Sequence, residues 1–105
     1  MAVDKDLLFE PMFDEDDFEI PGRGSIRVRG LSSAEVHKIK DEPPKKAECM
    51  IVAMASVDPL FTEEEAARLQ RKWSAGLWKR LVEQVQRLSG LADDAAKSDV
   101  QEVRE

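Results

Sequence analysis

The sequence is poor in the side chains on which catalysis and metal binding depend: its 105 residues include one cysteine, one histidine and no tyrosine. Cys49 cannot form an internal disulfide, which fits the reducing interior of a cell. His37 lacks the neighbouring cysteines or spaced carboxylates of a zinc site, and a nucleophilic Cys49 would need a base and an orienting group. We interpret both as structural side chains and predict a non-enzymatic protein that uses no metal and no cofactor.

Long apolar runs are also absent, because no stretch of about 18 apolar residues is available to cross a membrane. Residues 1–10 lack the basic start and the following apolar run of a secretory signal. With 42% apolar and 36% charged residues, the composition is typical of one soluble globular domain. We therefore expect neither a membrane span nor a secretory signal.

Charge is distributed unevenly along the chain. Residues 1–20 hold eight acids and one base, residues 92–105 hold five acids and two bases, and residues 21–91 hold nine acids and thirteen bases. Acidic ends repel phosphate, so nucleic acid is disfavoured as a partner of the whole chain. Two interpretations of the ends stay open: they only solvate the protein, or an acidic end masks a basic face until a partner arrives.

The first third of the sequence predicts an arm followed by a hairpin. Residues 1–17 combine apolar patches with an acidic run, and Pro11 argues against a long helix there, which favours a docking arm. Residues 18–28 alternate apolar and polar side chains around the turn-forming residues 21–24. We expect Glu19 to lie across the hairpin from Arg27 and Arg29.

The rest of the chain is punctuated as helices. Ser32 and Glu35 form a capping box, as do Thr62 and Glu65, while Ser74 can cap a third start and Gly90 suits a left-handed stop. We predict helices over residues 45–57, 62–73 and 75–89, after a short helix that ends before Pro43. The predicted fold is mainly α within the α+β class: an N-terminal β-hairpin, a bundle of three to four helices, and a disordered acidic tail over residues 92–105.

The last helix carries two adjacent apolar rows. Leu77, Leu81, Val85 and Leu88 form one row, and Trp78 and Val82 form the other. One row suffices for a core this small, so the second row, with Trp73 near it, predicts a self-association or partner groove. Packing of the tryptophans in the core is the alternative. The candidate partner-binding residues are Trp73, Leu77, Trp78, Leu81, Val82 and Val85.

Three motifs, taken in order, resemble those of a known family. V-R-G-L-S-x-A-E covers residues 28–35, V-D-P-x-F-T-E-E-E-A covers residues 57–66, and L-S-G-L covers residues 88–91. Together with the glycine-containing hairpin they resemble the tail assembly chaperones of long-tailed, siphovirus-type phages, especially phages of actinobacteria. The resemblance spans residues 18–91 and leaves the two ends uncovered.

The resemblance implies a function in phage assembly. Such chaperones coat the tape measure protein, whose long apolar helices aggregate when unprotected, while the tail tube protein polymerises around it. They act in the host bacterial cytoplasm, leave before the virion is complete, and are often accompanied by a longer form made by translational frameshifting. Residues 18–91 would be the chaperone domain. Two alternatives stay open: a head–tail completion or tail subunit retained in the virion, and a small nucleic-acid-binding regulator.

Overall fold

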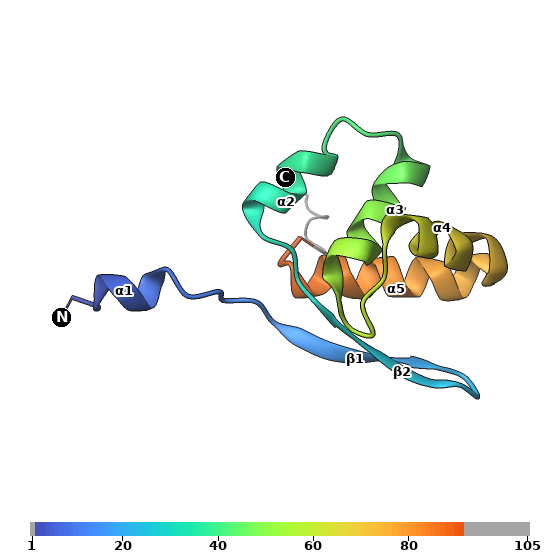
Figure 1. The fold of residues 1–105 in the computed structure, drawn as a ribbon, viewed down its shortest axis with the longest axis horizontal. Helices are drawn as coiled ribbons and strands as arrows, with labels where there is room; N and C mark the ends of the chain where they lie inside the picture. Colours follow the sequence, from blue (N-terminus) through green and yellow to red (C-terminus); the bar gives the residue numbers. More distant parts are fainter. Residues whose placement is uncertain (1, 92–105) are drawn as a thin grey trace, which may run out of the picture.

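The computed structural model describes residues 2–91, and this range contains a three-stranded antiparallel sheet and five helices (Figure 1). The strands, in the sheet order β1-β2-β3, are β1 (Glu15–Ile20), β2 (Gly24–Arg29) and β3 (Ser56–Asp58). The helices are α1 (Lys5–Leu8), α2 (Ser33–Ile39), α3 (Pro44–Ala55), α4 (Glu63–Lys72) and α5 (Ala75–Leu88). The predicted α+β class, with a hairpin that precedes the helices, is confirmed. The predicted disorder of residues 92–105 lies outside the described residues.

The hairpin closes through a three-residue loop over residues 21–23. Ile20 is opposite Gly24, and the backbone N–H of Arg23 donates to the carbonyl of Ile20 at 3.0 Å. Gly22 and Gly24 have φ of 74° and 107°, a left-handed conformation that glycine adopts without a Cβ clash. This loop fixes the register of the whole hairpin.

The register differs from the one predicted. Glu19 is opposite Ser25, and Arg27 is opposite Asp17, with which it forms an ion pair of 3.1 Å. Arg27 also reaches Glu15 at 3.0 Å. Strand β1 therefore begins at Glu15, inside the segment predicted to be arm, because acids of the predicted arm pair with an arginine across the hairpin. The arm is shorter than predicted.

Strand β3 was not predicted. The helix expected over residues 45–57 ends at Ala55, and Ser56 and Asp58 pair with Val28 and Arg27 of β2. The Ser56 hydroxyl donates to the carbonyl of Ala53 and accepts the N–H of Phe61, both at 3.0 Å. These two bonds turn the chain out of the helix and onto the free edge of β2.

The helix ends agree with the predicted punctuation. Both capping boxes form: Ser32 with Glu35, and Thr62 with Glu65. The Ser74 hydroxyl caps α5 by accepting the N–H of Leu77. Gly90 has φ of 80°, and the N–H groups of Gly90 and Leu91 donate to the carbonyls of Arg87 and Gln86, which is the Schellman arrangement.

One hydrophobic core joins the sheet to the helices. Helix α5 packs against both hairpin strands on one side and against α3 and α4 on the other (Figure 1). Among the described residues, the largest fully buried side chains are those of Val28, Val52, Leu81 and Val85. They come from β2, α3 and α5, so three elements that are distant in the sequence depend on one another for burial.

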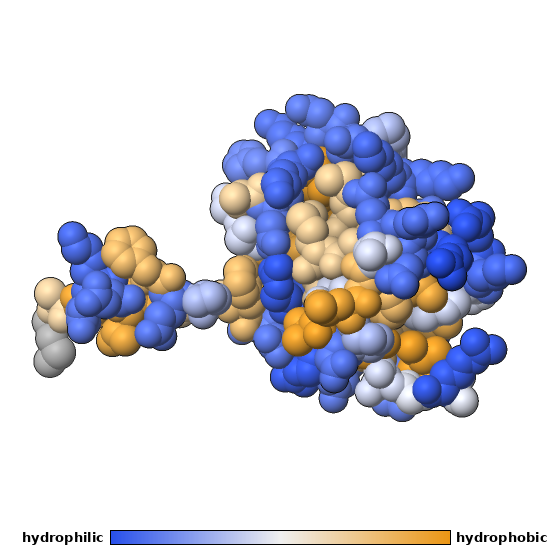
Figure 2. Space-filling view, in the orientation of Figure 1, coloured by the Kyte–Doolittle hydropathy of each residue, from blue (hydrophilic) through white to orange (hydrophobic). Residues whose placement is uncertain are grey.

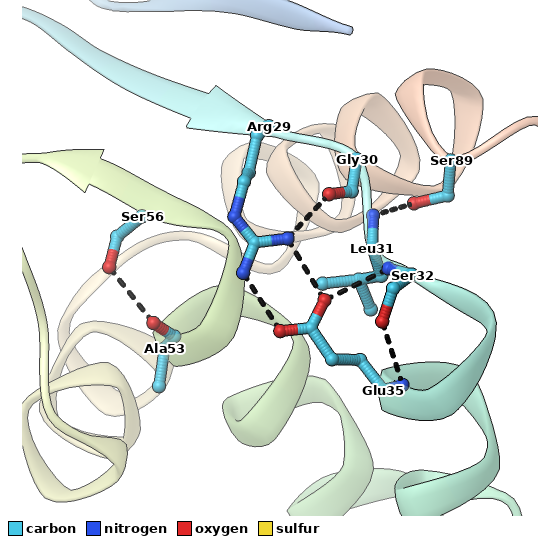
Figure 3. A network of polar contacts seen from close by, with 8 residues as sticks. All are labelled: Arg29, Gly30, Leu31, Ser32, Glu35, Ala53, Ser56 and Ser89. Carbon is cyan, nitrogen blue, oxygen red and sulfur yellow. Dashed lines mark hydrogen bonds and ion pairs between the residues drawn. The ribbon is translucent and has the colours of Figure 1, made fainter. Parts of the chain in front are cut away.

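The open end of the hairpin joins α2 and α5 in a dense polar cluster, which we call the junction (Figure 3). It consists of Arg29, Gly30, Leu31, Ser32, Glu35 and Ser89. The Arg29 guanidinium donates two parallel hydrogen bonds to the Glu35 carboxylate, at 2.9 and 2.8 Å. The Leu31 N–H donates to the Ser89 hydroxyl at 2.7 Å. The junction therefore connects three elements through charged and neutral hydrogen bonds.

Electrostatics in the junction favour ionised Glu35. Its carboxylate accepts from Arg29 and from the Ser32 backbone, and these hydrogen bonds lower its pKa from 4.5 to about 2 against the opposing effect of burial. The same ion pair raises the pKa of Arg29. The junction is also closely packed, because a Cβ on Gly30 would lie 2.4 Å from the carbonyl oxygen of Leu88.

Candidate functional site

The structure places four of the six predicted partner-binding residues in the core. Trp78 and Val82 are 5% and 6% exposed, and Leu81 and Val85 are fully buried. The prediction of a second, exposed row along α5 is therefore wrong. Its physical reason is that α5 lies between the hairpin and the α3–α4 pair, so both of its apolar rows find partners inside the molecule.

Trp78 has both an apolar and a polar reason to be buried. Its indole N–H donates to a carboxylate oxygen of Glu48 at 2.8 Å, and Gln70 donates to the same oxygen at 3.3 Å. Gln70 also donates to the carbonyl of Lys45 at 3.2 Å. A buried tryptophan needs such an acceptor for its N–H group, and here the acceptor links α3, α4 and α5.

Trp73 occupies a different position. It follows the last residue of α4 and lies between the hairpin and Trp78. Its ring stacks on Phe18 at a centroid distance of 6.4 Å and meets Trp78 edge-on at 6.5 Å. Trp73 is only partly buried, so it extends the aromatic core to the surface.

Trp73 and Leu77 line an open cavity of about 720 Å³ beside the hairpin turn, which we call the groove. Its partly buried floor is apolar: Ile20, Leu69, Trp73 and Leu77. Its exposed rim includes three cations: Arg23, Arg68 and Lys72. Pro21 and Ser74 complete the lining. Of the six predicted site residues, the structure brings Trp73 and Leu77 together in the groove and leaves the other four beneath the surface.

The charge of the groove rim is uncompensated within the described residues. Arg23, Arg68 and Lys72 form no ion pair within residues 2–91, whereas Arg27 and Arg29 are held by Glu15, Asp17 and Glu35. Free cations around an apolar floor attract an apolar segment that also carries acids.

A second cavity, of about 490 Å³, lies between α3 and α4. Cys49 is part of its lining, and Lys45, Lys46, Glu63 and Glu64 surround it with both signs of charge. Burial, followed by the nearby Glu48, raises the pKa of the Cys49 thiol, which makes its nucleophilic thiolate form less accessible. This cavity therefore offers neither an activated thiol nor a rim of one charge sign, and the groove is the stronger candidate site.

The N-terminal arm is the other unusual surface. Residues 2–12 project away from the body as a tether with one helical turn, and apolar side chains cover much of it (Figures 1 and 2). Leu7 is 58% exposed, Leu8 59%, Phe9 76% and Met12 84%. Exposed apolar side chains at this density are typical of a segment that docks on another surface, and the docking role of the arm stays a prediction.

Comparison with known proteins finds no matching family model, no matching curated protein and no matching solved structure. None of the helices within residues 2–91 is long and apolar enough to cross a membrane.

Proposed function

We propose that this chain is a tail assembly chaperone of a long-tailed phage, a non-enzymatic protein that binds the tape measure protein and keeps it soluble during tail tube assembly. The observation that carries the proposal is the groove: an apolar, aromatic floor inside a cationic rim. Amphipathic helices are recognised by grooves of this kind, through apolar anchors spaced along one helix face.

The floor supplies the adhesive part of such a contact. Trp73 presents part of a large ring that is fixed from behind by Phe18 and Trp78. A rigid aromatic side chain loses little conformational entropy on binding, which is one reason why tryptophan is enriched at interface hot spots. Leu69 and Leu77 flank it on α4 and α5 and widen the apolar contact.

The rim supplies orientation. The cations Arg23, Arg68 and Lys72 come from the hairpin, α4 and its end, so they bracket the floor. A partner helix with acids beside its apolar face would be held by both features, and charge complementarity would speed its capture. The tape measure protein, with long apolar helices, is the partner that the resemblance implies.

The motif residues support the proposal at the level of fold. Gly30 and Leu31 of the first motif contact Leu88 and Ser89 of the last one. The first and last motifs thus join the hairpin to α5, and the second covers β3 and the start of α4, so none of the three contains a groove residue, although the glycine-containing hairpin turn reaches the groove. A chaperone sharing this framework would vary its groove with its partner, which is how a fold carries different specificities.

Coexpression with the tape measure protein encoded by the same phage tests the function. The wild-type chain should keep that protein in the soluble fraction, and Leu69→Ser with Leu77→Ser in the groove should release it to the pellet. Leu60→Ser is the matched control, because Leu60 is 76% exposed and lies outside the groove. Equal precipitation with and without the wild-type chain would remove the main support for the proposal.

The place of action can be tested separately. We propose that the protein works in the host cytoplasm, alone or with a frameshifted longer form, near the polymerising tail tube protein, and that it leaves before the virion is complete. Mass spectrometry of purified virions should then detect the tail tube protein and not this chain. Stoichiometric recovery from virions would favour a retained tail or head–tail subunit instead.

A further inference from the structure

The arm and the groove have complementary chemistry. The arm carries the acids Asp4, Asp6 and Glu10 against one base, Lys5, and its apolar side chains are more than half exposed from Leu7 to Phe9. The groove offers an apolar floor within the reach of three cations that form no ion pair in the described part of the chain. Each surface has what the other lacks.

The root of the arm is fixed. The Arg29 guanidinium lies over the ring of Phe13, 4.5 Å from its centre, and the N–H of Gly30 donates to the carbonyl of Asp14 at 2.9 Å. Both contacts tie residues 13 and 14 to the junction. The free part of the arm therefore starts at Met12 and points away from the body (Figure 1).

The groove lies at the other end of the hairpin. Its lining includes Ile20 and Arg23, at the turn, whereas the arm departs just before Glu15. The six residues of β1 separate the two points by roughly 20 Å, at about 3.3 Å per residue. To fill its own groove, the arm would have to reverse at its fixed root and retrace the strand, so a second copy is the better placed donor.

We propose that the arm of one copy docks in the groove of a second copy, with Leu7, Leu8 and Phe9 on the floor and the arm's acids against the rim cations. The contact joins two different surfaces, so it is heterologous: it closes as a reciprocal pair or a ring, or it continues as a filament. Salt weakens it, because its rim component is electrostatic.

Sedimentation velocity of the full-length chain tests this contact without any phage partner, so the outcome is independent of the proposed function. The wild-type chain should associate as its concentration rises. Arg68→Glu with Lys72→Glu should weaken that association at least tenfold. Asp4→Lys with Asp6→Lys should do the same, although the second pair lowers the net negative charge and would relieve general repulsion.

The decisive experiment mixes the two charge-reversed proteins. Each alone should stay largely monomeric, and the mixture should associate, because reversed arm then meets reversed rim. Lys79→Glu with Arg80→Glu is the matched control: it makes the same change of net charge at exposed positions of α5 outside the groove, and it should associate like the wild type. Circular dichroism confirms that every variant is folded.

Three outcomes would overturn the inference. A wild-type chain that stays monomeric at all concentrations has no arm contact to explain. Association that resists both charge reversals uses another surface. A mixture of the two reversed proteins that remains monomeric shows that arm and rim do not meet.

Discussion

The two ends of the β1–β2 hairpin differ in how much room they leave. At the open end, the junction packs three elements so closely that even the methyl group of an alanine at Gly30 would meet the Leu88 backbone. At the turn end, the groove keeps about 720 Å³ free beside a partly buried tryptophan. One end is filled by the side chains and backbone of the fold itself, and the other leaves an open groove.

The residues that build the two ends also lie in different parts of the sequence. Residues of the junction belong to the motifs on which the proposed likeness to phage chaperones rests, and they form hydrogen bonds with one another inside the molecule. The rim cations Arg23, Arg68 and Lys72 belong to none of these motifs and have no ion pair within the described residues. The motifs at the junction therefore serve the fold itself, and we infer that the rim cations serve a binding partner.

The largest loss of stability is expected from removing the buried ring that supports the groove. Trp78→Ala removes a buried ring that supports Trp73 and anchors Glu48, and should cost about 3–5 kcal/mol of unfolding free energy. Urea denaturation measures it. Trp73→Ala should cost less, because Trp73 is only partly buried. If Trp73→Ala were the more destabilising of the two, the assignment of Trp78 to the core and Trp73 to the groove would be wrong.

The open end can be broken by adding one methyl group. Gly30→Ala places a Cβ 2.4 Å from the carbonyl oxygen of Leu88, and this overlap with backbone should cost about 2–3 kcal/mol. Gly76→Ala is the matched control: it has free space around its Cβ within α5, and should stabilise the protein by about 0.5–1 kcal/mol. Thermal melts that rank the two variants in the opposite order contradict the close contact.

The pH dependence of stability tests the Arg29–Glu35 ion pair of the junction. Folding lowers the pKa of Glu35 from 4.5 to about 2, so the unfolded chain binds the proton more readily. The contribution of the Glu35 carboxylate to stability is fully present above about pH 4.5 and is lost as the pH falls toward 2. Partial exposure reduces it to on the order of 1–2 kcal/mol.

Glu35→Gln should remove this contribution and flatten the pH dependence of the urea midpoint in that window. Asp58→Asn is a suitable control, since Asp58 lies at the end of β3 and forms no ion pair within residues 2–91. An unchanged profile in Glu35→Gln means that the Arg29–Glu35 pair contributes nothing to stability.

The smallest effect on stability is expected in the arm. Leu8→Ser with Phe9→Ser changes side chains that are 59% and 76% exposed, so the free energy of unfolding should stay within about 0.5 kcal/mol. The same variant should lose concentration-dependent association in sedimentation. A marked loss of stability in a dilute, monomeric sample would show that these side chains pack on their own body.

Local signals in the sequence predicted the local features of the fold. Ser32, Thr62 and Ser74 cap helices through hydrogen bonds that span three residues, so their spacing alone revealed them. Strand β3 has three residues and no periodicity to read, and it exists because Ser56 redirects the chain onto an edge supplied by β2. The hairpin register was missed because it depends on the loop length, which alternation does not fix.

The groove was only partly predictable. Trp73 and Leu77 were named from helical spacing, but Trp78 lies on the neighbouring face, and that face is buried by elements that fold over it from both sides. Ile20 and Arg23 reach the groove because the hairpin turn comes beside the α4–α5 connection. Contacts between segments some fifty residues apart leave no trace in either segment alone.

The aromatic series from Phe18 through Trp73 to Trp78 also has a spectroscopic consequence. The chain has two tryptophans and no tyrosine, so its near-ultraviolet emission arises almost entirely from these two indoles. Trp78 is enclosed, and its emission should hardly respond to a ligand, whereas Trp73 faces the groove. A segment that covers the groove should therefore shift the emission of the whole protein to shorter wavelength, and this native fluorescence would report occupancy without any attached label.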